Sequence, residues 1–355
     1  MLPDSSCRPL AAAIAAAVAL SLTTTGSAAD GPAVSGLRTG EGVLPAHGGS
    51  LVLHHEPAAF ADRMMSGGPP PDGIPSIDDP TFLPAGEHSL DPDDKVIGLV
   101  YDGVVRAYPH NIMVLHEIVN HDIGGENIAV TYCPLTATAQ GFKTGSTTLG
   151  VSGRLINSNL VMYDRDTGSL WPQIAATAIA GERTGETLEE IDLTWTTWGE
   201  WYAENPDTEL LSDRTGFARD YRRDPYGRYN PTGGYYNSER VMFPLMAQSD
   251  ELHPKHMVAG ARTAEQAAVF DLAQLADAGL IKTEHFVGVY QDSLSNAAVY
   301  RRDPEVRLQW DDGQVVNADT GARYAPDELP LESVITIEAF WFAWHATYPD
   351  SERSW

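Results

Sequence analysis

Hydrophobic and polar positions alternate over short stretches of the chain, and helical spacing is less frequent. Alternation over residues 96–105, interrupted at Asp102 and Gly103, predicts a β-hairpin that turns at those two residues. Pro109 can begin a helix whose apolar residues share one face until Gly124 and Gly125, which can end it. That face consists of Ile112, Leu115 and Val119.

Strand patterns dominate the residues that follow this helix. The predicted strands cover residues 128–132, 136–142, 147–151 and 159–163, and the last is followed by a turn at residues 164–168. Helical spacing returns at residues 195–203 and 338–346. With more strand than helix, the pattern predicts the α+β fold class.

Part of the sequence occurs twice. The pattern W-x-x-W-x-x-x-x-P-D-[ST] covers residues 198–208 and again residues 341–351. Further matches keep the same order: Asp-Thr-Gly at 166–168 and 319–321, and an apolar strand pattern at 128–132 and 286–290. Ordered matches predict an internal duplication, and therefore two pseudo-repeat, strand-rich lobes that each end in a helix.

The chain begins with a pattern typical of export. Arg8 precedes an apolar run at residues 10–22, and small residues follow at 27–29, where a signal peptidase would cut. The predicted organisation is a signal peptide at 1–29, a flexible Gly/Pro/Ala-rich leader at 30–72, a first lobe at 73–212, a connector at 213–252 and a second, degenerate lobe at 253–355. We therefore expect a secreted or periplasmic protein with no membrane insertion after cleavage.

Charge and cysteine content narrow the function. The formal net charge of −26 repels phosphate backbones and anionic lipid head groups, which excludes nucleic acid and membrane surfaces as favoured partners. Of the two cysteines, Cys7 precedes the predicted cleavage site, so the mature chain keeps Cys133 alone. An unpaired thiol in an oxidising compartment should be buried, metal-bound or reactive.

The predicted duplication provides an internal comparison. Positions that serve only the fold should keep their residue type in both lobes, whereas positions that serve chemistry can lose it from one. In the register read from the sequence, His110 faces Phe270, His116 faces Ala276, Glu117 faces Asp277 and Cys133 faces Gln291. The first lobe is therefore predicted to hold the site.

The histidines around this stretch raise the question of a metal. His116 and Glu117 begin like the zinc-protease pattern H-E-x-x-H, but Asn120 stands where the second histidine should be. A thiolate with one or two imidazoles still suits zinc or copper. The candidate ligands are Cys133, His116, His121 and His110.

The same residues also fit two other kinds of protein. In a thiol-dependent enzyme, Cys133 would be the nucleophile and His116 the base, with Glu117 or Asn120 orienting the imidazole. In a non-catalytic interaction module, Cys133 would be buried and inert and His116 hydrogen-bonded. The leading prediction is a secreted protein that binds a metal ion or small ligand through a single-thiolate Cys/His site.

Several other residues are candidate ligand contacts. Asn157 precedes the strand at residues 159–163, and Trp171 and Gln173 follow its turn; Asn120 shares the predicted helical face of His116. In the connector, a basic and aromatic run that includes Arg219 and Tyr221 could line a cleft for an anionic or sugar-like ligand. Alternatively, the arginines of this run pair with surrounding carboxylates.

The phrases AYP, HEIVN, TYCPL, NLVMYDRDTGSLWPQ and FWFAWHATYPD resemble the bacterial and archaeal family catalogued as domain of unknown function 3179. The resemblance runs from about residue 72 to the C terminus, and it implies no particular activity. Many members look like C-P-L-C, whereas Thr136 replaces the second cysteine here. This departure implies that dithiol redox chemistry is excluded and that a metal site would use one thiolate.

Overall fold

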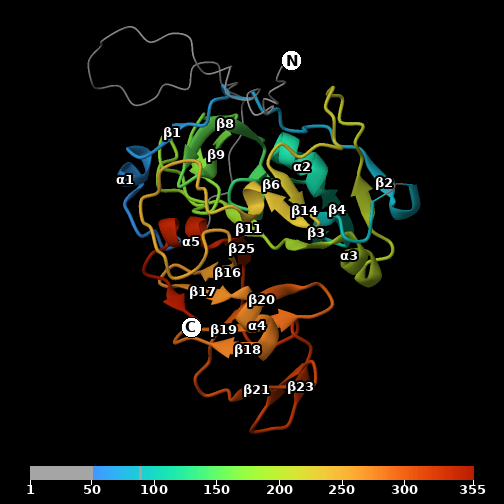
Figure 1. Cartoon of the computed structure of the whole chain (residues 1–355), viewed down its shortest axis with the longest axis vertical. Helices are drawn as coiled ribbons and strands as arrows, with labels where there is room; N and C mark the ends of the chain where they lie inside the picture. The colour runs from blue at the N-terminus through green and yellow to red at the C-terminus, as the bar shows by residue number, and fades with distance from the viewer. Residues whose placement is uncertain (1–50, 88–89) are drawn as a thin grey trace, which may run out of the picture. The chain divides into compact units, whose positions relative to one another are not determined.

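A computed structural model describes residues 51–87 and 90–355 (Figure 1). The predicted signal peptide at residues 1–29, and the start of the predicted leader, lie outside the described residues. The described residues belong to a single compact unit. Within them, no helix has the length and apolar character needed to span a membrane.

An N-terminal group of strands covers residues 65–211. Its strands are β1 (Met65–Ser66), β2 (Phe82–Pro84), β3 (Lys95–Tyr101), β4 (Val104–Pro109), β5 (Ile118–Ile123), β6 (Glu126–Cys133), β7 (Thr138–Gly145), β8 (Leu149–Ile156), β9 (Asn159–Asp164), β10 (Leu170–Pro172), β11 (Glu189–Ile191), β12 (Thr194–Thr197) and β13 (Glu209–Leu211). The helices up to this point are α1 (Pro57–Ala61), the short 3-10 helix η2 (Ala85–Glu87), α2 (His110–His116) and α3 (Trp198–Glu204).

The connector carries β14 (Gly227–Tyr229), β15 (Thr232–Gly234) and the 3-10 helix η3 (Tyr235–Asn237). A C-terminal group then covers residues 257–353. It contains β16 (Met257–Arg262), β17 (Ala267–Asp271), α4 (Leu272–Ala278), β18 (Leu280–Lys282), β19 (Phe286–Gln291), β20 (Asn296–Arg301), β21 (Leu308–Asp311), β22 (Gln314–Asn317), β23 (Arg323–Tyr324), β24 (Ser333–Val334), β25 (Thr336–Phe340), α5 (Trp341–Thr347) and β26 (Glu352–Arg353). The described chain is thus strand-rich with few helices, which agrees with the prediction of more strand than helix.

The strands pair mainly with neighbours along the chain. The N-terminal group forms sheets of order β12-β3-β4-β13-β2, β11-β7-β6-β5 and β1-β8-β9-β10. The C-terminal group forms sheets of order β25-β16-β17-β26, β24-β20-β19-β18 and β21-β22-β23. All these pairs are antiparallel except that β13 runs parallel to β4 and β26 runs parallel to β17. Antiparallel pairing follows from the short turns between consecutive strands.

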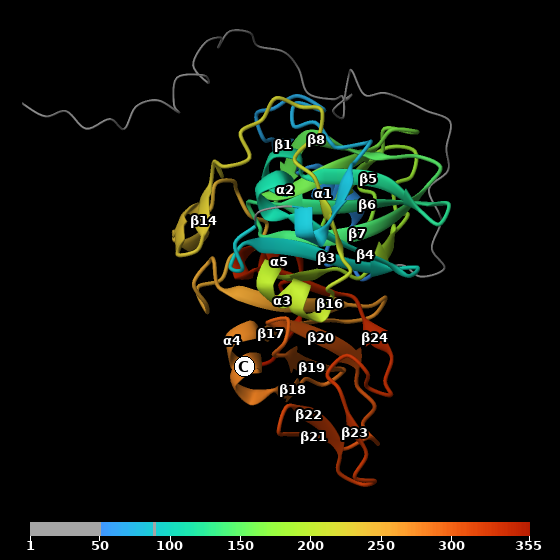
Figure 2. The ribbon, with the colours of Figure 1, turned by 90° about the vertical axis from the view of Figure 1, so that its right-hand side faces the viewer.

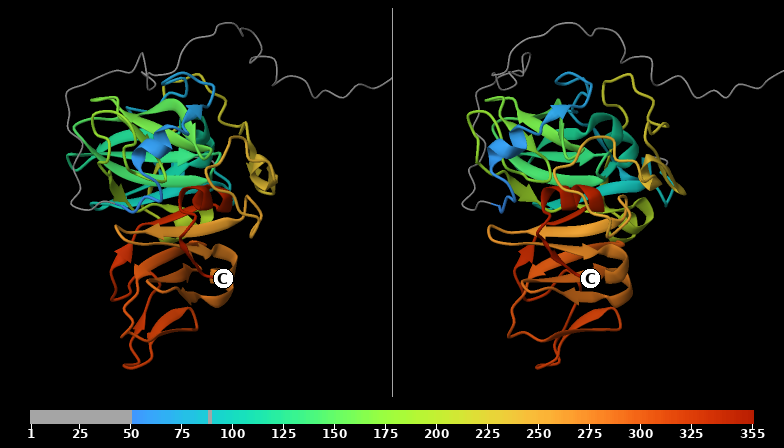
Figure 3. Two further views of the ribbon diagram at one scale, coloured as in Figure 1. Left: turned by 90° about the vertical axis from the view of Figure 1, so that its left-hand side faces the viewer. Right: turned by 60° about the vertical axis from the view of Figure 1, so that its left-hand side comes forward.

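The two groups meet near α3 and α5, as Figures 2 and 3 show. The backbone N–H of Phe340, at the end of β25, donates to the carbonyl of Thr136 at 2.9 Å. Beside this contact, the buried Arg262 forms an ion pair with Glu190, with 2.9 Å between Nη2 and Oε1. The described residues thus pack as one unit.

The predicted hairpin at residues 96–105 is confirmed as β3 and β4. Asp102 and Gly103 have φ angles of 48° and 75°, the left-handed values that a two-residue hairpin turn requires. Further along the chain, Gly124 and Gly125 have φ angles of 65° and 89° and turn β5 into β6. Those two glycines therefore end a strand, whereas the sequence pattern assigned them to the end of a helix.

The helix predicted after Pro109 is shorter than expected. α2 ends at His116, and β5 begins two residues later because its β-branched residues pair with β6, as Val119 does with Val130. Tertiary pairing thus overrides the helical spacing of the apolar residues. As a consequence, His116 and Asn120 do not share a helical face.

The predicted C-terminal helices begin three residues late in both groups. Residues 195–197 belong to β12, and residues 338–340 belong to β25. The repeated W-x-x-W-x-x-x-x-P-D-[ST] pattern has a direct structural meaning in each case. Its second tryptophan donates an indole hydrogen bond to its last residue, at 3.0 Å from Trp201 to Thr208 and at 3.2 Å from Trp344 to Ser351.

The predicted flexible leader is partly ordered. Of residues 30–72, the described part from residue 51 contains α1 and β1, and β1 pairs with β8. Gly153 explains this close approach, since a Cβ atom there would lie 2.1 Å from the carbonyl oxygen of Pro69. The backbone N–H of Gly67 donates to the Gly153 carbonyl at 2.8 Å. Folded structure therefore starts before residue 72.

The core lies on both faces of β6. Val130 and Tyr132 pack with Ile97, Met113 and other residues of one cluster. Cys133 belongs to a different cluster that continues towards β9, β10 and α5. Successive side chains on a strand point to opposite faces, so Tyr132 and Cys133 face different parts of the molecule. This alternation decides which of the predicted site residues can meet.

Candidate functional site

Glu117 ends α2 and connects it to β5. Its backbone is left-handed (φ 60°, ψ −26°), and its N–H donates to the carbonyl of Met113. Such a helix cap usually belongs to glycine, because the left-handed conformation costs other residues about 1–2 kcal/mol. Non-glycine residues held in this conformation concentrate at functional sites. The glutamate is therefore a candidate for more than a structural role.

The Glu117 side chain is also unusual in its surroundings. It is only 7% exposed, and its carboxyl group makes no hydrogen bond or ion pair with any residue that the structure describes. Burial raises its pKa to about 8. At neutral pH the group is therefore mostly a protonated acid, held in a site where its charged form lacks a partner.

Cys133 lies next to this carboxyl group. It is the last residue of β6, is 1% exposed, and its Sγ lies 3.7 Å from the carbonyl oxygen of Ser158. Burial, and then the nearby charge of Glu117, raise the pKa of the thiol to about 11. The sulfur is therefore a protonated, weakly donating group at neutral pH, and it is not activated as a nucleophile.

A cavity of about 120 Å³ opens beside Glu117. Its walls are largely apolar, and they come from the leader, β8, β9, the turn after β6 and the connector. The apolar residues are Ile74, Leu135, Val151, Leu155, Leu160, Tyr226, Met242 and Phe243. Glu117 and Arg154 are the charged residues that line it. An apolar cavity of this size holds a molecule of about the dimensions of benzene.

A bulge in β8 shapes one wall of the cavity. The pairing of β8 with β9 shifts between Val151 and Arg154, and Gly153 within the shift has a φ of 73°. Val151 pairs with Met162 and Arg154 pairs with the next residue, Val161, so two extra residues interrupt β8 here. Val151 and Arg154 both line the cavity. The Arg154 guanidinium has no ion pair or side-chain hydrogen bond within the described part of the chain.

The connector covers this site, and in Figure 3 it runs, yellow to light orange, along the outside of the N-terminal group. The hydroxyl of Tyr235 donates to the carbonyl of Leu135 at 2.9 Å. The N–H of Phe243 donates to the hydroxyl of Ser158 at 3.2 Å. These contacts hold Tyr226, Met242 and Phe243 over the cavity.

His116 does not meet Cys133. Its Nδ1 lies 2.7 Å from the carbonyl oxygen of Pro75, and its Nε2 lies 2.7 Å from the hydroxyl of Tyr221. Burial lowers its pKa, so the neutral ring donates from Nδ1 and accepts at Nε2. With both nitrogens engaged elsewhere, the predicted Cys133–His116 nucleophile–base pair is not formed.

His121 lies on β5 and faces β4. Arg106 Nη1 is 2.9 Å from its Nδ1, and the hydroxyl of Tyr108 is 2.7 Å from its Nε2. Burial and the neighbouring arginine lower its pKa to about 3. Both nitrogens are occupied, and an imidazole in this position can serve neither Cys133 nor a shared metal.

His110 sits among aromatic rings on the Tyr132 side of β6. The rings of Tyr132, Trp195, Tyr229 and Tyr236 lie 5.1–6.0 Å from its ring centroid. Burial lowers its pKa to about 3. Because Tyr132 and Cys133 point to opposite faces of β6, His110 cannot reach the thiol.

The predicted metal ligands are therefore not brought together. Cys133, His116, His121 and His110 occupy separate surroundings, and among the described residues no three His, Cys, Asp or Glu side chains form a group that could hold a metal ion. The prediction depended on a helix through residue 123. β5 replaces the end of that helix, and His116 and His121 each contact partners of their own.

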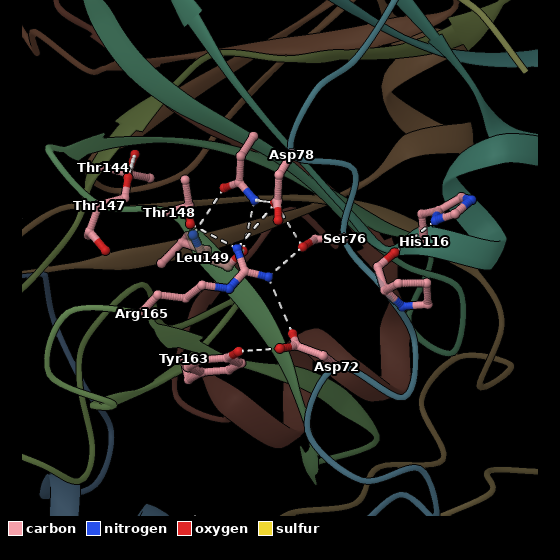
Figure 4. Close-up of polar contacts among 12 residues, drawn as sticks. Asp72, Ser76, Asp78, His116, Thr144, Thr147, Thr148, Leu149, Tyr163 and Arg165 are labelled. Atoms are coloured by element: carbon pink, nitrogen blue, oxygen red, sulfur yellow. Dashed lines mark hydrogen bonds and ion pairs between the residues drawn. The ribbon is translucent and has the colours of Figure 1, made fainter. Parts of the chain in front are cut away.

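Asn120 belongs to a polar network that holds residues 72–78 against β8. Figure 4 shows the part of this network around Arg165. Asn120 Nδ2 donates to Asp78 Oδ1 at 2.7 Å. Arg165 is the centre of this network, with Nη1 3.1 Å from Asp78 and Nη2 2.7 Å from the hydroxyl of Ser76 and 3.3 Å from Asp72. Asn120 is thus placed for a structural role, away from the cavity.

The other predicted ligand contacts also have protein partners. Asn157 donates to the carbonyl of Ala346 at 3.0 Å, and the indole of Trp171 donates to Asp164 at 3.0 Å. Gln173 is buried, and its amide nitrogen donates to Thr131 at 2.8 Å. None of these three side chains lines the cavity.

The connector lines two cavities with residues of its predicted basic and aromatic run. Tyr221 lines one of about 190 Å³, together with Arg222, Arg228 and Tyr229. Arg219 is exposed, and Tyr221 bonds to His116. Tyr226, five residues further on, reaches the cavity beside Glu117, whose charge raises the tyrosine pKa after the larger effect of burial. The aromatic run in the sequence indicated this region, and Gly153 inside a strand pattern is the signal that could have indicated the bulge that presents Arg154.

The family of the chain follows from its sequence over most of this structure. A family model described as "Protein of unknown function (DUF3179)" matches residues 71–351. The chain belongs to the DUF3179 family. The DUF3179 match includes Glu117, Cys133, Arg154 and Tyr226, and it extends across both groups of strands. No curated protein and no solved structure matched the chain.

Proposed function

We propose that this DUF3179 protein binds a small molecule in the cavity beside Glu117. The observation that carries the proposal is the buried Glu117 carboxyl group, which lacks a partner in the described chain and opens on an apolar cavity. Burying a carboxyl group without a hydrogen bond costs up to several kcal/mol, and such groups are rare in folded proteins. A ligand that pairs with the carboxyl group offsets that cost.

This proposal keeps the small-ligand function expected from the sequence but changes the residues that serve it. Glu117 replaces the histidines as the polar centre, and Cys133 stands behind it as a buried neighbour. The separated histidines disfavour a metal, and the raised thiol pKa disfavours a nucleophile. Binding is therefore better supported than either metal chemistry or thiol catalysis.

A fragment screen by thermal shift tests the proposal directly. Compounds of about six to eight non-hydrogen atoms, the size that the cavity admits, should raise the melting temperature of the wild-type protein. Met242→Trp should abolish these shifts, because Met242 lines the mouth of the cavity and is 40% exposed, so the larger ring can fill the mouth without disturbing the core.

Val100→Trp is the matched control. Val100 is 59% exposed and does not line the cavity, so this variant should keep every shift of the wild-type protein. Binding that persists in Met242→Trp, or the absence of any binding fragment, would contradict the proposal.

We also propose that the N-terminal and C-terminal groups are pseudo-repeats. The shared order of pairing supports this, since β12-β3-β4-β13 corresponds to β25-β16-β17-β26 and β11-β7-β6-β5 corresponds to β24-β20-β19-β18. A second support is the contact of Trp201 with Gly98 and of Trp344 with Gly260, where a Cβ atom would lie 2.2 Å from either ring. Two unrelated halves would not be expected to share both the order of strand pairing and the tryptophan–glycine contact.

The strand pairing also changes which residues of the two proposed repeats correspond to each other around Glu117. α2 and α4 both end in a left-handed residue, so Glu117 corresponds to Gly279, which has a φ of 73°. The sequence register placed Asp277 opposite Glu117, two residues away. Cys133 still corresponds to Gln291, because each ends the middle strand of its sheet. Glu117 thus stands where the other repeat keeps the residue that the backbone prefers, which supports a function for its side chain.

Export from the cytoplasm remains part of the proposed function. The support is the pattern of Arg8, the apolar run at residues 10–22 and the small residues before position 30. Burial of Cys133 also suits an oxidising compartment, because a buried thiol is protected. N-terminal sequencing of the mature protein should find residue 30 first, and an intact Met1 would contradict export by cleavage.

A further inference from the structure

We infer that the cavity takes a small zwitterion, with its cationic group at Glu117 and its anionic group at Arg154. The inference rests on the proposed binding function and adds the chemical class of the ligand. Primary amines that also carry a carboxylate, such as small amino acids, belong to this class.

The first support is that a carboxyl group and a guanidinium group line the cavity and do not pair with each other. Glu117 and Arg154 both line it, yet no ion pair joins them and neither side chain has another polar partner within the described residues. A carboxylate and a guanidinium within reach of each other in an apolar space attract strongly, so the lack of an ion pair means that the two groups lie too far apart for direct contact. A ligand with a charge at each end satisfies both groups while it keeps them apart.

The second support is the character of the walls. The remaining lining is apolar or aromatic, so the Tyr226 hydroxyl is the one further side-chain hydrogen-bonding group among the described residues that line the cavity. Tyr226 and Phe243 supply aromatic rings, which attract a cation bound near them. The volume of about 120 Å³ admits only a short aliphatic body between the two charges.

Cation binding should also release a proton. Glu117 is mostly protonated at neutral pH, and a bound ammonium group favours its carboxylate form. The Cys133 thiol on β6 and the Tyr226 hydroxyl from the connector interact electrostatically with Glu117, and Arg154 on β8 lines the same cavity. The thiol and the phenol have raised pKa values, so neither titrates below pH 8 and Glu117 alone accounts for the proton.

Four probes of similar size test the contribution of each ligand charge to binding. Calorimetric titration of the full chain with L-alanine, ethylamine, propionate and propanamide compares a zwitterion, a cation, an anion and a neutral amide. We expect L-alanine to bind at least about 10-fold more tightly than each of the others, since losing one charge-assisted contact costs about 1.5–3 kcal/mol. Its affinity should rise about 10-fold from pH 6 to pH 7, as the ionised fraction of a group with a pKa of about 8 rises 10-fold.

Two variants assign the contacts. Glu117→Gln should weaken the binding of L-alanine and remove its pH dependence, while the affinity for propionate stays unchanged. Arg154→Gln should weaken the binding of both L-alanine and propionate, while the affinity for ethylamine stays unchanged. The exposed Glu204→Gln and Arg222→Gln are the matched controls and should bind as the wild type does.

The outcomes separate this inference from the proposed function. If propanamide binds as tightly as L-alanine, or if other fragments bind and L-alanine does not, the ligand class is overturned and the cavity proposal stands. If neither these probes nor any fragment binds, both are overturned.

Discussion

The backbone N–H of Tyr132 donates a 2.7 Å hydrogen bond to the carbonyl of Glu117. On its other side, the N–H of Glu117 donates to Met113. These two bonds fix the left-handed cap at the end of α2 and hold the Glu117 carboxyl group beside Cys133. The carboxyl group is buried in this position, and its burial has consequences that can be measured.

The first consequence is a pH dependence of stability. The pKa of Glu117 is about 8 in the folded protein and near 4.3 in an unfolded chain. Between these values the folded protein holds one more proton, so the free energy of unfolding should fall as pH rises, by at most about 1.4 kcal/mol per pH unit. Glu117→Gln should lose this slope, which urea denaturation at pH 5, 6, 7 and 8 can measure.

Glu204→Gln serves as the control for this measurement, because Glu204 is exposed. It should follow the wild-type curve at every pH. The stability difference between Glu117→Gln and the wild-type protein should grow from pH 5 to pH 8; a constant difference would show that Glu117 titrates as an ordinary carboxylate.

The second consequence concerns the thiol. Cys133 is 1% exposed and burial raises its pKa to about 11, so about one thiol in a thousand is ionised at pH 8, compared with about a quarter at the ordinary pKa of 8.5. Iodoacetamide should therefore modify the folded protein at least about 100-fold more slowly than it modifies free cysteine. Mass spectrometry measures the rate, and the same reaction in 8 M urea is the control. Rapid modification of the folded protein would restore the nucleophile hypothesis.

The sequence predicted local features better than the site. The turn at Asp102 and Gly103 was predictable because two-residue hairpins demand such residues. Residues 118–123 were assigned to a helix because their apolar spacing fits one. Only their pairing with β6 shows that they form a strand. The predicted meeting of His116 with Cys133 assumed this longer helix. In the structure, His116 contacts Pro75 and Tyr221 instead.

Glu117 was among the predicted residues, but in a secondary role. Its importance comes from burial and from the lack of a partner, and a sequence alone shows neither. Arg154 was not predicted, because its place in the cavity wall goes with an irregular pairing of β8 with β9 that the sequence pattern does not show. Tyr226 comes from the connector, more than ninety positions from Cys133 in the sequence, and no local pattern predicts that contact.

The network around Arg165 supports a third prediction (Figure 4). Its guanidinium is 2.7 Å from Ser76 and pairs with Asp72 and Asp78, so it holds the segment that carries Ile74, a residue of the cavity wall. Arg165→Gln should lower the free energy of unfolding by about 2–4 kcal/mol, since it leaves partly buried carboxylates unpaired. Urea denaturation measures the loss, and limited proteolysis should show faster cleavage between residues 66 and 78.

Arg222→Gln is the control for Arg165. Arg222 is exposed and pairs only with the neighbouring Asp220, so its loss should cost less than about 1 kcal/mol. Equal costs for the two variants would mean that the Arg165 network adds no more than a surface ion pair does.

The contacts of Trp201 with Gly98 and of Trp344 with Gly260 lead to the last prediction. A Cβ atom at either glycine would lie 2.2 Å from the indole ring, and both rings are buried. Gly98→Ala and Gly260→Ala should therefore each lower the free energy of unfolding by about 1–3 kcal/mol through overpacking. Gly86→Ala is the control, since nothing lies within 4 Å of its Cβ position, and it should change stability by less than about 0.5 kcal/mol. Because the same contact occurs in both groups of strands, the two costs should be similar; a large loss at one glycine and none at the other would argue against pseudo-repeats.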